Sequence, residues 1–95
     1  MITLHIEHEI TDFGTWKQAF ERFAGMRRDG GVVSQRVYRP LDDNRYVIIH
    51  LDFAAADEAR KFLDFLTTRV WASPADAPAL AGTPRTRFLE AAAEG

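Results

Sequence analysis

The chain has 95 residues, a formal net charge of −2 and no cysteine. This length predicts one domain spanning residues 1–95, and the lack of cysteine excludes disulfides, thiol nucleophiles and thiolate metal sites. No run of Lys and Arg stands out, so neither nucleic acid nor an anionic membrane surface is an expected partner. The sequence has no signal-peptide pattern and no apolar stretch near the ~18 residues of a membrane helix, so we expect a cytoplasmic protein.

The first part of the chain predicts a strand, a helix and a second strand. Residues 2–10 alternate between apolar and polar side chains, which is typical of a strand. From Phe13 onward the bulky residues recur at a helical period, and Asp12 is a suitable cap for that helix. We expect the helix to end near residue 29, before a pair of glycines. Residues 32–39 alternate again and predict the second strand.

The remaining elements complete an α+β fold. Residues 39–45 are rich in turn-forming side chains and precede a clear strand at 46–53, which indicates a hairpin. Residues 56–71 predict a second helix, 72–84 with three prolines a loop, and 85–91 a last strand. The order β-α-β-β-α-β with right-handed crossovers predicts a ferredoxin-like fold, a four-stranded antiparallel sheet with both helices on one face.

The sheet face away from the helices is expected to carry a mixed set of side chains. Aligning the first and third strands sets His5 across from His50, where opposed side chains are close neighbours. A mixture of Tyr, Ile, His, Glu and Arg resembles the wall of a pocket; a solvated face or a dimer interface with internal ion pairs fits the same pattern. A hairpin centred on the turn pairs Tyr38 with Tyr46, Arg36 with Ile48 and Ser34 with His50. The expected face contains His5, Glu7, Ser34, Arg36, Tyr38, Tyr46, Ile48, His50 and Asp52.

These residues supply the candidate site. A histidine base with an Arg or Tyr to hold an oxyanion would bind a phenol and favour its anion. Trp71 ends the second helix beside the proline-rich loop and is placed to form the wall of a pocket. The candidate catalytic residues are His50, His5 and Arg36, and the candidate ligand-binding residues are Tyr38, Tyr46, Ile48, Glu7 and Trp71.

The histidines also allow two other interpretations, a structural role for His8 and a metal site at His5 and His50. His8 shares its parity with Ile6 and Ile10, so a semi-buried structural role is favoured over a catalytic one. His5 and His50 with Asp52 have the chemistry of an iron-binding triad. Because the expected register sets Asp52 across from Thr3 and no local spacing requires a metal, we expect none.

The segment HEITDFGTWKQAF (residues 8–20) resembles the H-x-V-x-D-[YF]-x-x-W opening of small dimeric α+β barrel proteins of the antibiotic biosynthesis monooxygenase superfamily. The similarity continues through RRDGGVVSQRVYRPLDDNRYVIIHLDF, DEARKFL and FLE, and so covers nearly the whole chain. It implies a homodimer in which two sheets pack face to face, with a cleft between sheet and helices or at the barrel mouth. The superfamily includes cofactor-independent oxygenases of aromatic polyketides, haem-degrading enzymes, and isomerases or cyclases. Haem degraders carry a His on the second helix, which this chain lacks.

Residues and resemblance together predict a homodimeric protein that binds a small organic ligand without a cofactor. The candidate reaction is cofactor-independent oxygenation of a phenolic or polyketide-like substrate. The alternative is a non-catalytic ligand-binding or dimerisation protein, and the sequence is compatible with both. An RNA-recognition module has the same strand order, but residues 45–53 lack its K/R-G-F/Y-G/A-F-V-x-F/Y run.

Overall fold

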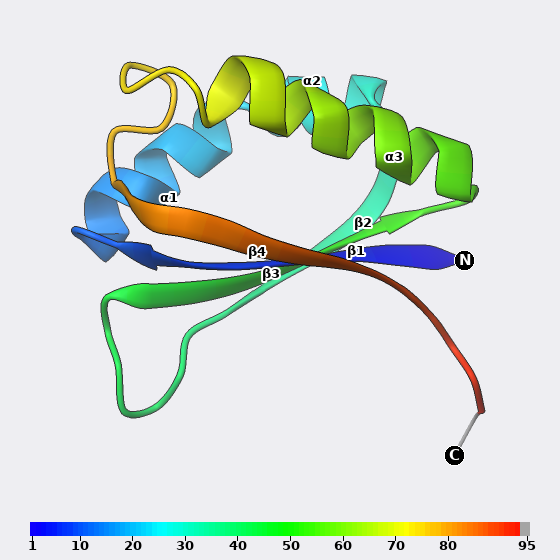
Figure 1. Cartoon of the computed structure of the whole chain (residues 1–95), viewed down its shortest axis with the longest axis horizontal. Coiled ribbons are helices and arrows are strands. Elements are labelled where there is room, and N and C mark those ends of the chain that lie inside the picture. Colours follow the sequence, from blue (N-terminus) through cyan, green and yellow to red (C-terminus); the bar gives the residue numbers. More distant parts are fainter. Residues whose placement is uncertain (94–95) are drawn as a thin grey trace.

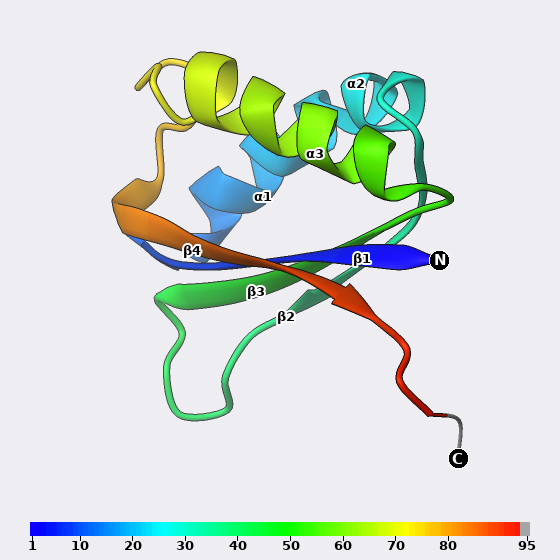
Figure 2. The same cartoon turned by 45° about the vertical axis from the view of Figure 1, so that its right-hand side comes forward.

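One antiparallel sheet with helices on a single face makes up the structure, a computed structural model that describes residues 1–93 (Figure 1). The strands lie in the order β2-β3-β1-β4, which places β2 and β4 at the edges. The predicted ferredoxin-like α+β fold is confirmed, and a view turned by 45° shows the same two layers (Figure 2). No helix in the described part of the chain is long and apolar enough to cross a bilayer. In chain order the elements are β1 (Ile2–Ile10), α1 (Phe13–Arg22), α2 (Ala24–Asp29), β2 (Val32–Tyr38), β3 (Tyr46–Phe53), α3 (Ala56–Phe65), the π-helical turn η1 (Leu66–Val70) and β4 (Leu80–Glu90).

The core lies between the sheet and the helices and follows from the alternation of the strands. Leu4 and Ile6 on β1 and Leu51 on β3 are almost completely buried, as a period of two predicts. Each large apolar side chain buried here stabilises the fold by about 1.5–3 kcal/mol. The alternation therefore decides which face of the sheet turns toward the helices. The helices complete this layer with Trp16, Ala19, Ala59 and Phe62.

The first predicted helix is divided into α1 and α2, so the expectation of one continuous helix was wrong. Asp12 caps α1 as predicted and accepts a hydrogen bond from the amide of Thr15 at 2.8 Å. The chain leaves regular helical geometry at Phe23, where φ is −95° and ψ is 13°. Arg27 then donates to the carbonyl of Phe20, which also accepts from the Phe23 amide at 3.3 Å at the end of α1. The break thus places an arginine across the end of α1.

The hairpin between β2 and β3 is shifted by two residues from the predicted register. The amide of Ile10 donates to the carbonyl of Arg45 at 2.9 Å, so β1 holds the beginning of β3 and the turn is asymmetric. Because the shift is an even number of residues, each side chain stays on its predicted face. Tyr38 pairs with Ile48 and not Tyr46, and Arg36 pairs with His50 and not Ile48. Ser34 pairs with Asp52 and not His50.

The last strand begins at Leu80, five residues before the predicted start, so part of the predicted loop is strand. Pro84 argued against a strand here because proline cannot donate to the ladder. β4 is an edge strand, however, and edge strands tolerate proline. The helix predicted for residues 56–71 also differs slightly, because α3 ends at Phe65 and continues as η1.

A bulge in β4 lies directly opposite His8. Glu7 pairs with Arg85 and Glu9 with Ala81, so residues 82–84 of β4 face a single residue of β1. Gly82 permits this path because its φ of 70° is accessible to glycine at little cost. Bulges of this kind release a strand from its ladder and redirect nearby side chains. His8 is consequently paired on its β3 side only, with Val47.

Candidate functional site

The open face of the sheet has a pair of histidines at its centre. His5 and His50 are directly opposite each other, as predicted, and their Nδ1 and Nε2 atoms lie 2.9 Å apart. One imidazole donates and the other accepts, so the pair shares a proton. Burial lowers the pKa of His50, and repulsion by His5 and Arg36 lowers it further, against a smaller opposing effect of Asp52. Tyr38 completes the group with its ring set edge-on to His50.

Asp52 is the most fully bonded group on this face. Its carboxylate accepts hydrogen bonds from Thr3 and Ser34, both at 2.6 Å, and from Arg36 at 3.2 Å. Its side chain is only 8% exposed. Burial acts to raise the pKa of Asp52, but the hydrogen bonds from Ser34 and Thr3 and the charge of Arg36 outweigh it and hold the pKa below its usual value.

A second set of contacts continues the network toward β4. Arg85 lies 3.7 Å from Glu7 and donates to the hydroxyl of Tyr46 at 3.1 Å. Ile48 pairs with both Glu7 and Tyr38 across the ladder. The structure therefore brings together seven of the eight sequence-predicted site residues, all except Trp71. Ligand binding on this face stays a prediction, and the described residues contain no group of three or more side chains with the geometry of a metal site.

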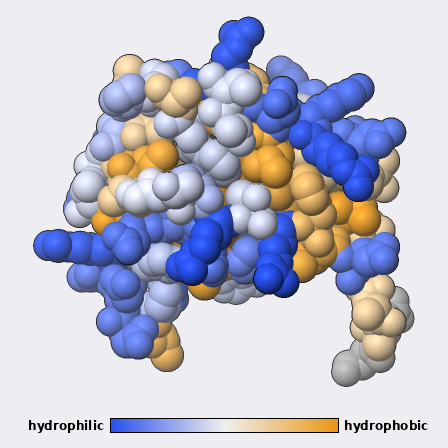
Figure 3. Space-filling view, in the orientation of Figure 1, coloured by the Kyte–Doolittle hydropathy of each residue, from blue (hydrophilic) through white to orange (hydrophobic). Residues whose placement is uncertain are grey.

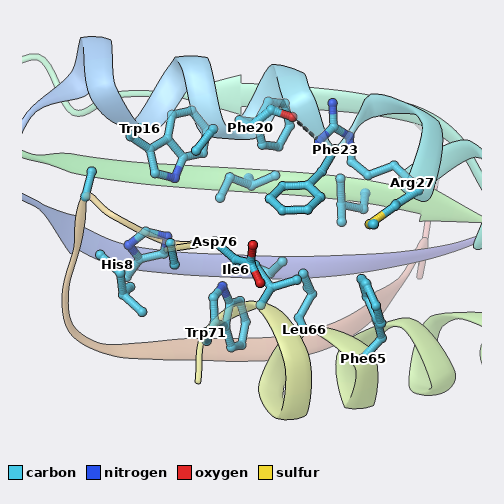
Figure 4. A pocket seen from close by; sticks show the side chains of 18 of the residues that line it. Ile6, His8, Trp16, Phe20, Phe23, Arg27, Phe65, Leu66, Trp71 and Asp76 are labelled. Carbon is cyan, nitrogen blue, oxygen red and sulfur yellow. Dashed lines mark hydrogen bonds between the residues drawn. The ribbon is translucent and has the colours of Figure 1, made fainter. Parts of the chain in front are cut away.

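The other face of the sheet encloses a cavity of about 80 Å³ beneath the helices (Figure 4). Its lining is mostly apolar, and its ionisable members are His8, Arg27 and Asp76. Figure 4 shows His8, Trp16, Trp71 and Asp76 toward one end of the cavity and Phe65 toward the other. We call the first of these the polar end.

His8 occupies the polar end as a neutral imidazole. Its Nδ1 lies 2.8 Å from the carbonyl of Glu9, and because a carbonyl only accepts, Nδ1 carries the hydrogen. The side chain is 4% exposed, and burial lowers its pKa despite the raising effect of that hydrogen bond. Nε2 therefore holds a lone pair, and it has no hydrogen-bond partner within residues 1–93. This bond lies within β1, and the imidazole also faces the cavity.

The π turn places Trp71 on the cavity wall. The amide of Trp71 donates to the carbonyl of Leu66 at 2.7 Å, a bond spanning five residues instead of four. The wider turn sets Trp71 above Leu66, whereas a regular helix would set Val70 there. Trp16 forms the facing wall from α1 and is stacked between Phe13 and Phe20. Trp71 is thus a cavity residue as predicted, but it lies on the side of the sheet opposite the other predicted site residues.

Arg27 lies away from the polar end. Its guanidinium donates to the Gln35 side chain at 2.7 Å and to the Phe20 carbonyl, and it lies over the Phe20 ring. The residue is 6% exposed, and this burial lowers the pKa of the guanidinium. Its bonds join α1, α2 and β2, which gives Arg27 a structural role beside the cavity.

Comparison with known proteins identifies solved structures of the same shape, although no family model and no curated protein matches the chain. The cofactor-independent oxygenase SnoaB from Streptomyces nogalater is 16% identical, with a TM-score of 0.70 over 98% of this chain and 94% of that one. A candidate antibiotic biosynthesis monooxygenase from Bordetella bronchiseptica is 9% identical, with a TM-score of 0.77 over 97% of each chain. A dimeric ferredoxin-like protein from an uncultured marine organism is 10% identical, with a TM-score of 0.72 over 99% of this chain and 97% of that one.

This chain has the same fold as these structures. The suspected resemblance is confirmed at the level of structure, and identities of 9–16% carry it no further than the fold. Within this fold the chain has two polar regions, one on each face of its sheet.

Sequence reasoning missed part of the cavity. Asp76 lies in a segment read only as loop, and nothing in its neighbourhood signals an inward side chain. His8 was detectable, because its parity with Ile6 placed it beneath the helices. Its catalytic potential depends on the free Nε2 and on the bulge of β4, neither of which strand alternation reports.

Proposed function

We propose that this protein binds a small aromatic molecule in the cavity beneath the helices and acts as a cofactor-independent oxygenase on a phenolic or polyketide-like substrate. One observation carries the proposal: a buried, neutral His8 presents an unpartnered Nε2 lone pair at the end of an apolar cavity. Apolar walls with a few directed polar groups are typical of small-molecule sites. Burial keeps His8 unprotonated, which is the form that can accept a proton from a phenol.

The proposed reaction uses only the substrate and O₂. The substrate is the phenol tautomer of a ring ketone, in which one hydrogen of a ring CH₂ has moved to the carbonyl oxygen. His8 Nε2 removes that phenolic proton, and the resulting anion transfers one electron to O₂. The two radicals combine at the former CH₂ carbon and His8 returns the proton, which gives a hydroperoxide. Loss of water, with the hydrogen still on that carbon, then leaves C=O. One oxygen atom enters the product and the other leaves as water with both hydrogens of that carbon. The oxidation of CH₂ to C=O supplies the four electrons that O₂ requires, so the balance needs no other reductant.

The size of the cavity limits how the ligand fits. Benzene fills an engineered cavity of about 150 Å³ in another protein, so the present 80 Å³ is too small for a ligand of two or three rings. Binding therefore requires a wall to move outward. The segment between η1 and β4 is the candidate, since its two prolines, Pro74 and Pro78, limit its hydrogen bonding.

The decisive experiment compares the two faces of the sheet. We expect His8→Gln to weaken binding of 1-naphthol, followed by fluorescence, about tenfold or more through loss of one directed hydrogen bond. His50→Gln is the matched control on the open face and should leave binding unchanged. The reverse pattern would locate the site at the sequence-predicted residues His50, His5 and Arg36. Oxygen uptake with an anthrone substrate tests the reaction, and binding without uptake would favour the non-catalytic alternative.

We further propose that a second copy of the chain covers the open face. Tyr38 is 46% exposed there, and Leu89 on the same face of β4 is also exposed. The loop between β2 and β3, which contains the exposed Leu41, and residues 91–93 after β4 both extend to the side of the sheet away from the helices (Figure 1), where Figure 3 shows two projections. The dimeric ferredoxin-like neighbour supports this arrangement. Light scattering at micromolar concentration should give twice the mass of the chain, and a monomer mass would rule out the barrel dimer.

A further inference from the structure

Asp76 is a cavity group for which the fold provides no partner. It lies in residues 71–79, the segment that joins η1 to β4 and covers the polar end; we call this segment the strap. The strap is anchored where Ser73 donates to the Val70 carbonyl at 3.2 Å and where Thr11 donates to the Ala79 carbonyl at 2.9 Å. Between the anchors, the amides of Asp76 and Ala77 both donate to the Ser73 carbonyl. Backbone bonds therefore position Asp76, and its side chain takes no part in them.

The Asp76 carboxylate faces into the cavity beside Trp71 (Figure 4). Within residues 1–93 it forms no ion pair and no side-chain hydrogen bond. Arg27 is the cation of the lining, and its guanidinium is bonded to Phe20 and Gln35 away from the polar end. A half-buried carboxylate without a counter-charge favours hydrogen-bond donors near it and disfavours anions.

The polar end contains further polar atoms without partners. Trp16 and Trp71 each have an indole N–H, and neither donates to any group of the described chain. His8 Nε2 and the Asp76 carboxylate are acceptors that likewise have no hydrogen-bond donor within residues 1–93. A complementary ligand must therefore both donate and accept at this end. A hydroxyl group does both, a carboxylate only accepts, and an ammonium only donates.

We propose that Asp76 makes the cavity selective for neutral, hydroxylated aromatic molecules over aromatic carboxylates. This inference rests on the proposed function, because it assigns the class of ligand for that same cavity. One hydroxyl donates to His8, a second donates to Asp76, and the hydroxyl oxygens accept from the two indoles. A carboxylate is repelled by Asp76 and leaves His8 without a donor.

The test uses three probes that share one ring system: 1,8-naphthalenediol, 1-naphthol and 1-naphthoate. The whole chain should bind the diol most tightly and naphthoate about tenfold or more weaker than naphthol, as expected for a like charge in a half-buried site. Asp76→Asn keeps the shape of the side chain and removes its charge, so naphthoate should bind no more than about threefold more weakly than naphthol. Asp76→Glu keeps the charge and should keep the roughly tenfold difference in affinity between the two probes. Asp64→Asn, on the exposed side of α3, is the matched control and should change nothing.

Each outcome bears on the inference separately from the proposed function. If His8→Gln weakens naphthol binding but Asp76→Asn leaves the difference in affinity between naphthoate and naphthol unchanged, the selectivity role is wrong and the cavity remains the site. If no probe binds the wild-type chain, both proposals fail together. Tighter binding of naphthoate than of naphthol by the wild type would also overturn the inference. Thermal melts of each variant show that it is folded, and Asp76→Glu keeps the comparison available if Asp76→Asn is unstable.

Discussion

The two faces of this sheet are built from the same strands but treat their polar groups in opposite ways. On the open face His5 bonds His50, and Asp52 accepts from three neighbours. Beneath the helices, His8 and Asp76 have side-chain atoms with no partner in the described chain. A network that satisfies itself contributes to stability and strand register. Polar groups around a cavity that have no partner in the described chain are open to water or to a ligand. The cavity is therefore the stronger candidate for binding, although the open face contains more polar residues.

The largest expected difference between the faces concerns stability. Trp16 is 9% exposed and stacked between two phenylalanines, so Trp16→Ala should lower the free energy of unfolding by about 3–5 kcal/mol. Tyr38 on the open face is 46% exposed, and Tyr38→Ala should cost about 0.5 kcal/mol or less in the monomer. Urea denaturation of both variants measures the two values. Equal losses would mean that Trp16 does not belong to the core or that Tyr38 is buried in a dimer, and light scattering separates these cases.

The second prediction tests whether the open-face network is self-satisfied. Asp52→Ala removes the acceptor for Thr3, Ser34 and Arg36 and should cost about 2 kcal/mol, a typical value for hydrogen bonds to a charged group. Asp52→Asn keeps the shape and should cost less, because its amide oxygen still accepts. Ligand binding in the cavity should be the same in both variants. A loss of naphthol binding without loss of stability would instead show that Asp52 belongs to a ligand site.

Strand alternation predicted both faces of the sheet because burial enforces it. A slip of one residue would expose the buried side chains of Leu51 and Val47 to solvent. The face of the sheet on which each side chain lies is therefore strongly specified. The register of β1 against β3 was also predicted, since both strands are central and strongly apolar on one face. The hairpin register was not, because a shift of two residues preserves every face. The observed register is established by the pairs of β2 with β3 themselves.

The cavity was less predictable, since its functional groups come from irregular backbone. Trp71 turns inward because η1 contains one wide turn, and a helical period continued through residue 71 gives a different direction. Asp76 is oriented by turns within the strap, which carry no periodic signal. The open face attracted the site prediction because it groups His, Arg and Tyr visibly in sequence. Which of those groups already have partners is a property of the fold and cannot be read from the pattern.

The smallest expected effect is on pH dependence, and both faces contribute to it with the same sign. Burial lowers the pKa of His8 and of His50 below the ordinary value of 6.5, which the unfolded chain keeps. Between the folded and unfolded pKa values the unfolded chain binds more protons, so stability rises with pH there. Stability should therefore be full above pH 6.5 and fall as the pH drops toward the folded values. A lowered pKa for Asp52 adds a further loss at pH values below its ordinary 3.8.

Single variants divide this slope between the two faces. His8→Gln should flatten the dependence below pH 6.5 more than His50→Gln, because His8 is the more deeply buried of the two. Urea midpoints measured on either side of that pH give the slope for each variant. Saturating naphthol should steepen the wild-type slope, since protonation of His8 removes the lone pair that the ligand needs, and it should not affect His8→Gln. A wild-type slope that is flat or reversed would mean that neither imidazole is desolvated, which would leave His8 without the property that makes it a base.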